Sequence, residues 1–271
     1  MLGSEMCQRP YSYLSTQWMQ SGVESGDCLM LHTSLRRTLS SEVARSNDLG
    51  PSDVLRSFLD VLGPKGTLIV PLFNFGFCDG DPFDIRSTQS NMGAFTECAR
   101  LWPGAVRTGH PVYSFAVLGF HAPEFLGVDN ESAFGPDSPF AHLLRLNGKV
   151  GALDLEENDS MTFHHFVEES CGAVYRYLKP FSAEYTNAKG ETCTKRYLIN
   201  VRNIEMGVET YANPAGELLW EAGLYRGSRP GCDSGLRVIN ANEMFTFMSE
   251  IILGNRAEGV LYRTFHDLPS D

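Results

Sequence analysis

Several features that mark membrane or nucleic-acid-binding proteins are missing from this sequence of 271 residues. Its longest apolar stretches, at 66–77 and 244–254, fall well short of the roughly 20 residues that a membrane span needs. No run of Lys or Arg occurs, and 22 basic against 33 acidic residues give a net charge of −11. Because nucleic acid is bound through basic patches, we expect neither a membrane nor a nucleic-acid partner.

The seven cysteines are widely spaced, with no C-x-x-C pair of the kind that binds zinc or exchanges disulfides. The first residues also lack the basic and apolar segments of a secretion signal. Both absences favour reduced thiols and a cytoplasmic location. The excess of acidic residues has two readings: it steers a cationic substrate such as a polyamino sugar, or it only keeps the protein soluble.

Apolar periodicity predicts a strand at 27–31, a helix at 51–62 and a second strand at 67–73. Pro51 suits the first turn of the helix, where its missing N–H costs nothing, and Gly63-Pro64 ends it. Strand, helix and strand within about fifty residues are typical of a βαβ unit with parallel strands. The sequence therefore favours the α/β class.

Weaker patterns fill the rest of the chain. The further elements that we expect are strands at 113–120 and 150–155, helices at 92–102, 139–146, 159–169, 215–224 and 241–253, and a hairpin over 181–201. We expect no regular structure in the polar stretch 36–50, in the loop 74–91 or in the polar tail. All of this fits one domain over 1–271, with a core at 27–178 and a smaller hairpin-plus-helix region at 179–271.

The densest group of ionisable residues lies at 159–169, at the start of a predicted helix. On a helix, positions i and i+3 share a face, so His165 lies beside Glu168, whereas His164 points about 100° away. A carboxylate raises the basicity of a neighbouring imidazole, which is the arrangement of a general base. The alternative is a histidine that only caps the helix or bonds within the core.

Three other segments place polar groups near strand ends. His32 to Arg36 follow the first strand, where open α/β sheets bind ligands, and their hydroxyl and backbone groups suit a phosphate or a thioester. The segments 107–115 and 134–140 place further Ser and His residues at a strand edge and at a helix N-terminus. Each of the three, taken alone, is equally compatible with an ordinary turn.

Taken together and in order, these segments resemble the aminoglycoside 3-N-acetyltransferase family, over about residues 27–170. The matching motifs are H-T-S-L at 32–35, L-G-P-K-G-T-L-I-V-P at 62–71, F-D at 83–84 with M-G at 92–93, P-G-A-V-R at 103–107 with H-P at 110–111 and Ser114, F-G-P-D-S-P at 134–139, and T-F-H-H-F-V-E at 162–168. The chain departs from the family pattern at Thr33, in the longer stretch 39–50 and at Phe166-Val167.

The resemblance implies a mixed central sheet flanked by helices and an acetyl-CoA-dependent enzyme without a metal. It gives His165 the role of general base and Glu168 that of its carboxylate partner. It also implies a groove for CoA and its thioester, lined by His32, Thr33, Ser34, Leu35, Arg36, Ser114 and Phe115.

The acceptor implied by the resemblance is an amino group on an amino sugar, an aminoglycoside or another small-molecule amine, bound by a monomer or homodimer. The acidic loop 75–84 offers Asp79, Asp81 and Asp84 to ammonium or hydroxyl groups, although the loop is equally compatible with a solvated surface. Two rival functions stay open. One is a CoA- or sugar-binding relative without turnover, and the other is a metal-dependent hydrolase that uses His164, His165, Glu168 and Glu169.

Overall fold

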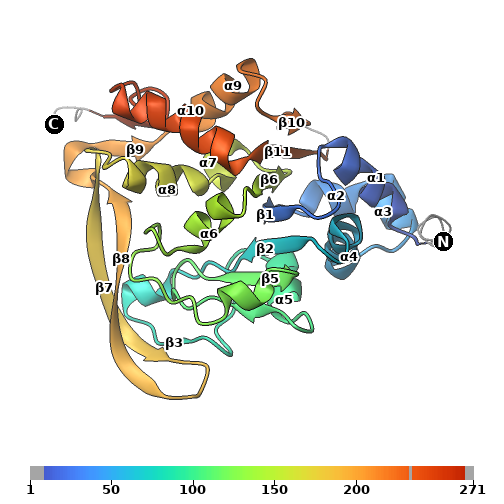
Figure 1. The fold of residues 1–271 in the computed structure, drawn as a ribbon, viewed down its shortest axis with the longest axis horizontal. Helices are drawn as coiled ribbons and strands as arrows, with labels where there is room; N and C mark the ends of the chain where they lie inside the picture. Colours follow the sequence, from blue (N-terminus) through green and yellow to red (C-terminus); the bar gives the residue numbers. More distant parts are fainter. Residues whose placement is uncertain (1–8, 232–233, 266–271) are drawn as a thin grey trace, which may run out of the picture.

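A computed structural model describes residues 9–231 and 234–265, built around a seven-stranded sheet (Figure 1). In spatial order the strands are β10 (Arg226–Gly227), β11 (Leu236–Asn240), β6 (Lys149–Leu153), β1 (Cys28–Thr33), β2 (Thr67–Pro71), β5 (Phe115–Gly119) and β4 (Val106–Arg107). β1 runs parallel to both β2 and β6, whereas β5 and β11 run antiparallel to their neighbours. The predicted parallel pair and the mixed sheet are both confirmed.

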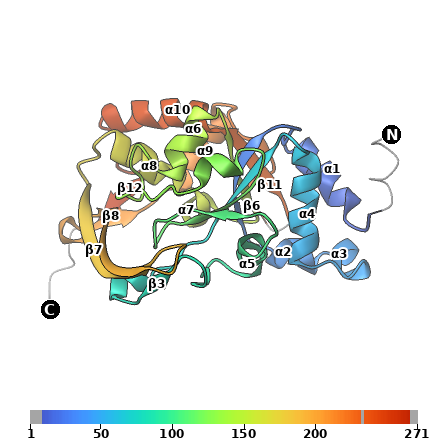
Figure 2. The same ribbon diagram turned by 60° about the horizontal axis from the view of Figure 1, so that its bottom comes forward.

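Helices cover both faces of this sheet (Figures 1 and 2). The helices on one face are α1 (Ser12–Gln20), α4 (Pro51–Leu62) and α5 (Ala94–Arg100), and those on the other are α6 (Pro139–Arg145), α8 (Phe163–Ser170) and α10 (Ala241–Leu253). Side chains alternate along a strand, so Leu29 and Leu31 of β1 pack with α1, α4 and α5, while Met30 packs in the opposite cluster. Two apolar cores therefore hold the sheet in place.

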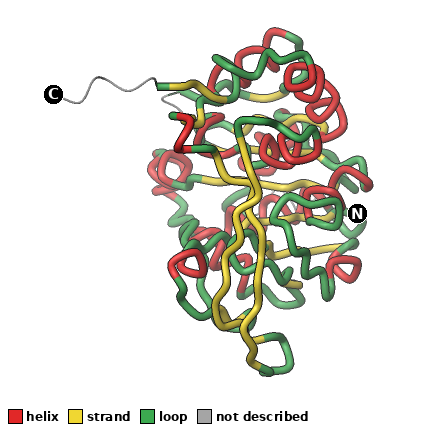
Figure 3. The backbone as a smooth tube through the Cα atoms, turned by 90° about the vertical axis from the view of Figure 1, so that its left-hand side faces the viewer, coloured by secondary structure: helices red, strands yellow, loops and turns green. Residues whose placement is uncertain are grey.

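A long hairpin runs along one side of the molecule and extends past its lower end (Figure 3). It consists of β7 (Arg176–Thr186) and β8 (Thr192–Arg202), paired along their whole length, and the short β3 (Phe83–Asp84) lies parallel to β7. At the turn, Asn187 Oδ1 accepts hydrogen bonds from the backbone N–H groups of Lys189 and Glu191. The predicted hairpin is confirmed, and it is longer than its apolar alternation indicated.

The structure differs from the sequence predictions in several places. The stretch 36–50 holds two short helices, α2 (Arg36–Ser40) and α3 (Glu42–Ser46). The helix expected at 159–169 is two helices, α7 (Glu157–Ser160) and α8, because Met161 leaves the helical conformation with ψ of 63°. We predicted neither α1 nor β11, although β11 lies in the central sheet beside β6.

The remaining elements are short. They are η2 (Gly76–Asp79), η3 (Ala122–Phe125), η4 (Ile204–Met206), β9 (Val208–Thr210), α9 (Asn213–Glu221) and β12 (Tyr262–Thr264), of which β9 and β12 pair with each other. The loop 74–91, for which we expected no regular structure, holds η2 and β3, and part of the expected polar tail is a strand. Residues 266–271 lie outside the described residues. Among the described helices, none is both long enough and apolar enough to cross a bilayer. The five cysteines within the described part of the chain are free thiols, whereas Cys7 and Cys232 lie outside it.

Candidate active site

A cavity of about 240 Å³ opens where β1 and β2 end, under the segment that contains α7 and the start of α8. His32 from β1, Phe73 after β2 and His165 from α8 all line it. The carboxyl ends of parallel strands are the common ligand-binding edge of an α/β sheet. The fold therefore brings together two of the histidines that the sequence singled out.

His165 and Glu168 form a hydrogen-bonded pair on α8, with 2.7 Å between Nδ1 and Oε2. They lie three residues apart, so the helix itself places both side chains on one face. Glu168 is buried, while 21% of the His165 side chain stays exposed. Because Nδ1 is held by the carboxylate, Nε2 is left to meet a ligand.

Burial, together with a neighbouring charge, makes His165 less basic than the sequence indicated. Burial lowers the pKa of His165 and the Arg176 guanidinium lowers it further, and Glu168 offsets only part of both effects. Glu168 raises the pKa of His165 as expected, but the expected net increase was wrong, because the helix segment showed neither the burial nor Arg176. With its pKa lowered, the imidazole is neutral near pH 7, which is the form that accepts a proton.

Glu168 stays ionised despite its burial. Burial raises the pKa of its carboxyl group, but Arg176 and His165 outweigh that effect and bring the pKa down to about 2. Arg176 Nε lies 2.6 Å from Glu168 Oε2. A buried carboxylate with two such partners is a fixed orienting group for the imidazole.

His164 points away from its neighbour and belongs to a different buried group. Its Nε2 lies 2.8 Å from Glu157 Oε1, and Glu157 also accepts hydrogen bonds from Tyr225 and Arg237. The predicted divergence of the two histidines is confirmed. In the part of the chain that the structure describes, no three His, Cys, Asp or Glu side chains are arranged to hold a metal ion. The geometry therefore does not favour the metal-dependent hydrolase.

The turn after β1 lies at the cavity only in part. His32 Nε2 lies 3.2 Å from Thr162 Oγ1, and burial together with the Arg237 charge lowers the pKa of His32 to about 3. Thr33 Oγ1 is buried without a hydrogen-bond partner among the described residues, but Thr33 does not line the cavity, so a role for it in binding stays a prediction. Ser34 donates its N–H to the Leu153 carbonyl, and Leu35 and Arg36 begin α2.

Ser114 and Phe115 lie behind the cavity wall. Both are fully buried, and the Ser114 hydroxyl is already bonded by Arg107 and by the Leu72 carbonyl. The Phe115 ring packs against Phe73 at 5.4 Å between centroids. Phe73 itself lines the cavity, so Phe115 reaches the cavity only through that ring. The place of Ser114 and Phe115 in a CoA groove stays a prediction.

The three aspartates of loop 75–84 do not line either cavity that His165 borders. Asp79 and Asp81 are exposed, while Asp84 is held by Arg86 at 2.7 Å. That hydrogen bond lowers the pKa of Asp84 to about 2. Their role in binding an acceptor also stays a prediction.

Sequence reasoning missed two residues that position the imidazole. Arg176, the first residue of the hairpin, holds Glu168, and the Phe134 ring meets the His165 ring edge-on at 5.5 Å. Phe134 belongs to the F-G-P segment, so its motif was a usable signal. Nothing local marked Arg176, because its partner lies in a separate element.

A second cavity, of about 310 Å³, lies between α8 and the hairpin. His165, Tyr113 and Thr210 line both this cavity and the first one. His165 therefore stands where two cavities meet, which allows two substrates to approach the same imidazole.

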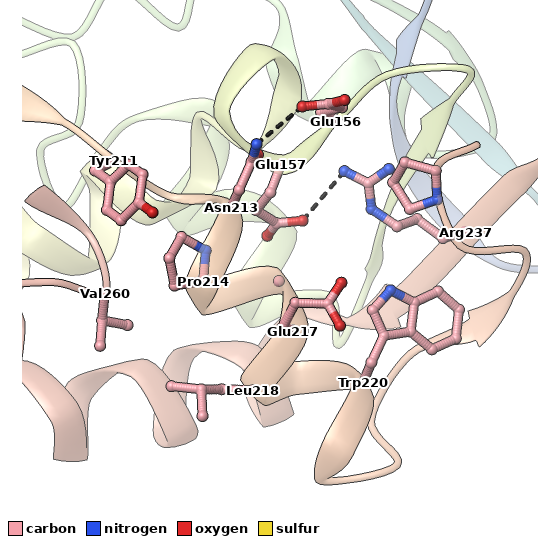
Figure 4. Close-up of a pocket in the computed structure, with 12 residues that line it drawn as sticks. Glu156, Glu157, Tyr211, Asn213, Pro214, Glu217, Leu218, Trp220, Arg237 and Val260 are labelled. Carbon is pink, nitrogen blue, oxygen red and sulfur yellow. Dashed lines mark hydrogen bonds and ion pairs between the residues drawn. The ribbon is translucent and has the colours of Figure 1, made fainter. Parts of the chain in front are cut away.

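A larger cavity of about 640 Å³ lies on the far side of α7, next to α9 (Figure 4). Asn213 donates a hydrogen bond to Glu156 at its edge, and Arg237 holds Glu157 at 3.1 Å (Figure 4). Glu157 lines this cavity as well as the one at His165. The buried group around Glu157 thus forms the wall between them.

A family model described as aminoglycoside 3-N-acetyltransferase matches residues 30–252. The chain belongs to this family. Similar curated proteins are the aminoglycoside N(3)-acetyltransferases IX of Micromonospora chalcea, 31% identical over 170 residues, and VII of Streptomyces paromomycinus, 32% identical over 168 residues. The matches cover 54% and 53% of this chain, which spans 57% and 55% of the two relatives, or about half their length.

Solved structures of family members share the fold across nearly the whole chain. AAC-IIIb in a binary complex with CoASH has a TM-score of 0.75 at 21% identity and covers 91% of this chain and 96% of its own. Sisomicin-bound AAC-VIa gives 0.75 at 21%, with 90% and 97% covered. At these identities the likeness establishes the α/β fold with its mixed sheet, as predicted.

Proposed function

We propose that the protein is an acetyl-CoA-dependent N-acetyltransferase that acts on an amino group of an amino sugar. The observation that carries this proposal is the pair His165–Glu168 at the junction of two cavities, with the imidazole neutral and its Nε2 available. Membership of the family and the CoASH complex of AAC-IIIb support acetyl-CoA as the donor. The gentamicin and apramycin complexes of AAC(3)-IVa support an amine acceptor.

In the proposed reaction, His165 Nε2 accepts a proton from the acceptor ammonium while Glu168 holds Nδ1. The free amine attacks the thioester carbonyl and a C–N bond forms. The C–S bond breaks, the nitrogen gives up a second proton to the departing CoA thiolate, and His165 releases its own proton to water. A positioned general base contributes about 10²–10⁴-fold to such a step. Transfer is direct, and no side chain carries the acetyl group.

We assign the thioester to the cavity at His32, because His32, the first residue of the polar segment 32–36, lines it together with His165. His32 itself is neutral, so it serves as a hydrogen-bonding side chain and not as a second cation.

The test is an assay of acetyl-CoA with a panel of amines, in which the released CoA thiol and the mass of the product are both measured. We expect CoA release that depends on the amine and a product heavier by one acetyl group. CoA release without any acetylated amine would contradict the proposal and indicate hydrolysis. Binding of acetyl-CoA without release would favour the relative that has lost turnover.

A further inference from the structure

The cavity between α8 and the hairpin carries charge of one sign. Three basic residues line it, namely Arg176, Lys179 and Arg202, and no Asp or Glu is among the described residues that do so. The cavity at His32 is lined instead by Glu157, Asp159 and Glu168. The sign of the charge therefore changes from one side of His165 to the other.

Two of the three basic charges are not neutralised by the protein. Arg176 forms an ion pair with Glu168, but Lys179 and Arg202 form no ion pair with any residue in the ranges 9–231 and 234–265. Arg202 is the cross-strand partner of Arg176, so two guanidinium groups belong to one rung of the hairpin. Glu168 compensates the charge of Arg176, so Arg202 and Lys179 are the two charges left for a bound anion.

The lining also offers flat apolar surfaces. Tyr177 and Phe181 alternate with the basic residues along β7, and Lys179 lies over the Phe181 ring at 5.3 Å. An apolar and aromatic lining with a few polar or charged groups is typical of a small-molecule site, in which the charged groups set the orientation of the ligand. About 310 Å³ is enough for a single sugar ring and its substituents.

We propose that this cavity is the acceptor site and that it selects an amine that also carries a phosphate or carboxylate group, held by Lys179 and Arg202. The inference rests on the proposed function and names its substrate class. The diphosphate of CoA lies at the far end of the long, uncharged pantetheine arm, so the reacting thioester does not bring it to His165. The acceptor is the substrate whose other groups lie beside the base.

The charge of the cavity beside His165 indicates the substrate better than the net charge of the whole chain does. The whole chain is acidic, yet the surface beside the base is basic. A polycationic aminoglycoside would meet Lys179 and Arg202 with like charge, which disfavours its binding.

The experiment compares glucosamine with glucosamine 6-phosphate as acceptors for the wild type, Lys179→Ala and Arg202→Ala. A charge-assisted hydrogen bond to phosphate predicts that each variant raises KM for glucosamine 6-phosphate about 10- to 100-fold, with kcat nearly unchanged. KM for glucosamine should stay the same. The matched controls are Lys189→Ala at the hairpin turn and Arg196→Ala on β8, neither of which lines the cavity.

Further measurements distinguish an anion carried by CoA from one carried by the acceptor. They also distinguish failure of the proposed site from failure of the proposed function. If Lys179→Ala raises KM for acetyl-CoA but not for the phosphate-free donor S-acetyl-N-acetylcysteamine, the cavity binds CoA and the inference is overturned. It is also overturned if the wild type binds sisomicin more tightly than glucosamine 6-phosphate in calorimetry. Calorimetric binding of glucosamine 6-phosphate that Arg202→Ala weakens, without acetylation of any amine, would uphold the site while contradicting the proposed function.

Discussion

Arg176, the first residue of β7, forms an ion pair with Glu168 of α8, with 2.6 Å between Nε and Oε2. The contact joins the hairpin to the carboxylate that orients His165. The strand that supplies the basic cavity wall thus also sets the electrostatics of the base. Arg176 is therefore a positioning residue, and its effects should appear in the pH dependence of the reaction.

Replacing Arg176 and replacing Glu168 should shift the pH profile of kcat/KM in opposite directions, because the two side chains have opposite effects on the pKa of His165. The neutral imidazole is the active form, so kcat/KM rises with pH through the pKa of His165. Arg176→Met removes a charge that lowers this pKa, so the acidic limb should move to higher pH. Glu168→Gln removes a group that raises it, so the limb should move to lower pH.

Steady-state kinetics between about pH 5 and 8 measure both shifts, with Arg176→Lys as the charge-preserving control. The double variant Arg176→Met, Glu168→Gln leaves no buried carboxylate unpaired and guards against misfolding of either single variant. Shifts of the same sign in the two single variants would contradict this account of the dyad.

The group around His164 should matter for stability and not for chemistry. His164→Ala leaves Glu157 with fewer partners at a buried position, so the free energy of unfolding should fall while kcat stays within a few-fold of the wild type. Arg237→Met should lower the free energy of unfolding by up to about 3–5 kcal/mol, the range for breaking a buried ion pair, because Glu157 then keeps only His164 and Tyr225 as partners. Denaturant titration measures both, and Arg263→Ala is the control, because its exposed pair with Glu209 contributes about 1 kcal/mol or less.

Glu168 should make the protein sensitive to acid. Its pKa is about 2 in the fold against an ordinary value of 4.5, so the unfolded chain binds the proton more readily in the interval between them. The resulting stabilisation is complete above about pH 5 and is lost as the pH falls toward 2. Urea titrations at stepped pH should show this slope, and the slope should be shallower for Glu168→Gln. Equal slopes for the two proteins would place the acid-sensitive group elsewhere.

The sequence predicted best those elements whose apolar residues recur with a strong period. The helix at 51–62 and the helix at 241–253 have the predicted bounds, because buried side chains recur on one face of each. Helices α2 and α3 were missed, because five residues are too few to show a period. The break at Met161 was missed because the polar and apolar pattern runs on across it.

In the candidate site, too, the contacts within one helix were predictable, whereas the contacts between separate elements were not. The pair His165–Glu168 follows from helix geometry alone, because residues at positions i and i+3 lie on the same face of a helix. Arg176, Phe134 and the partner Glu157 of His164 come from other elements, and only the tertiary fold brings them close. Net charge also gave no indication of the basic cavity, because a sum over the chain hides where the charges lie.

The most direct test of the central claim measures kcat and CoA affinity together for His165→Gln and His164→Ala on one active amine. The account predicts that His165→Gln loses about 10²–10⁴-fold in kcat, the range for a missing general base. Its CoA affinity in calorimetry should match the wild type, because the lost interaction belongs to the transition state. A His165→Gln enzyme with wild-type kcat, or a His164→Ala enzyme that alone loses it, would contradict the account.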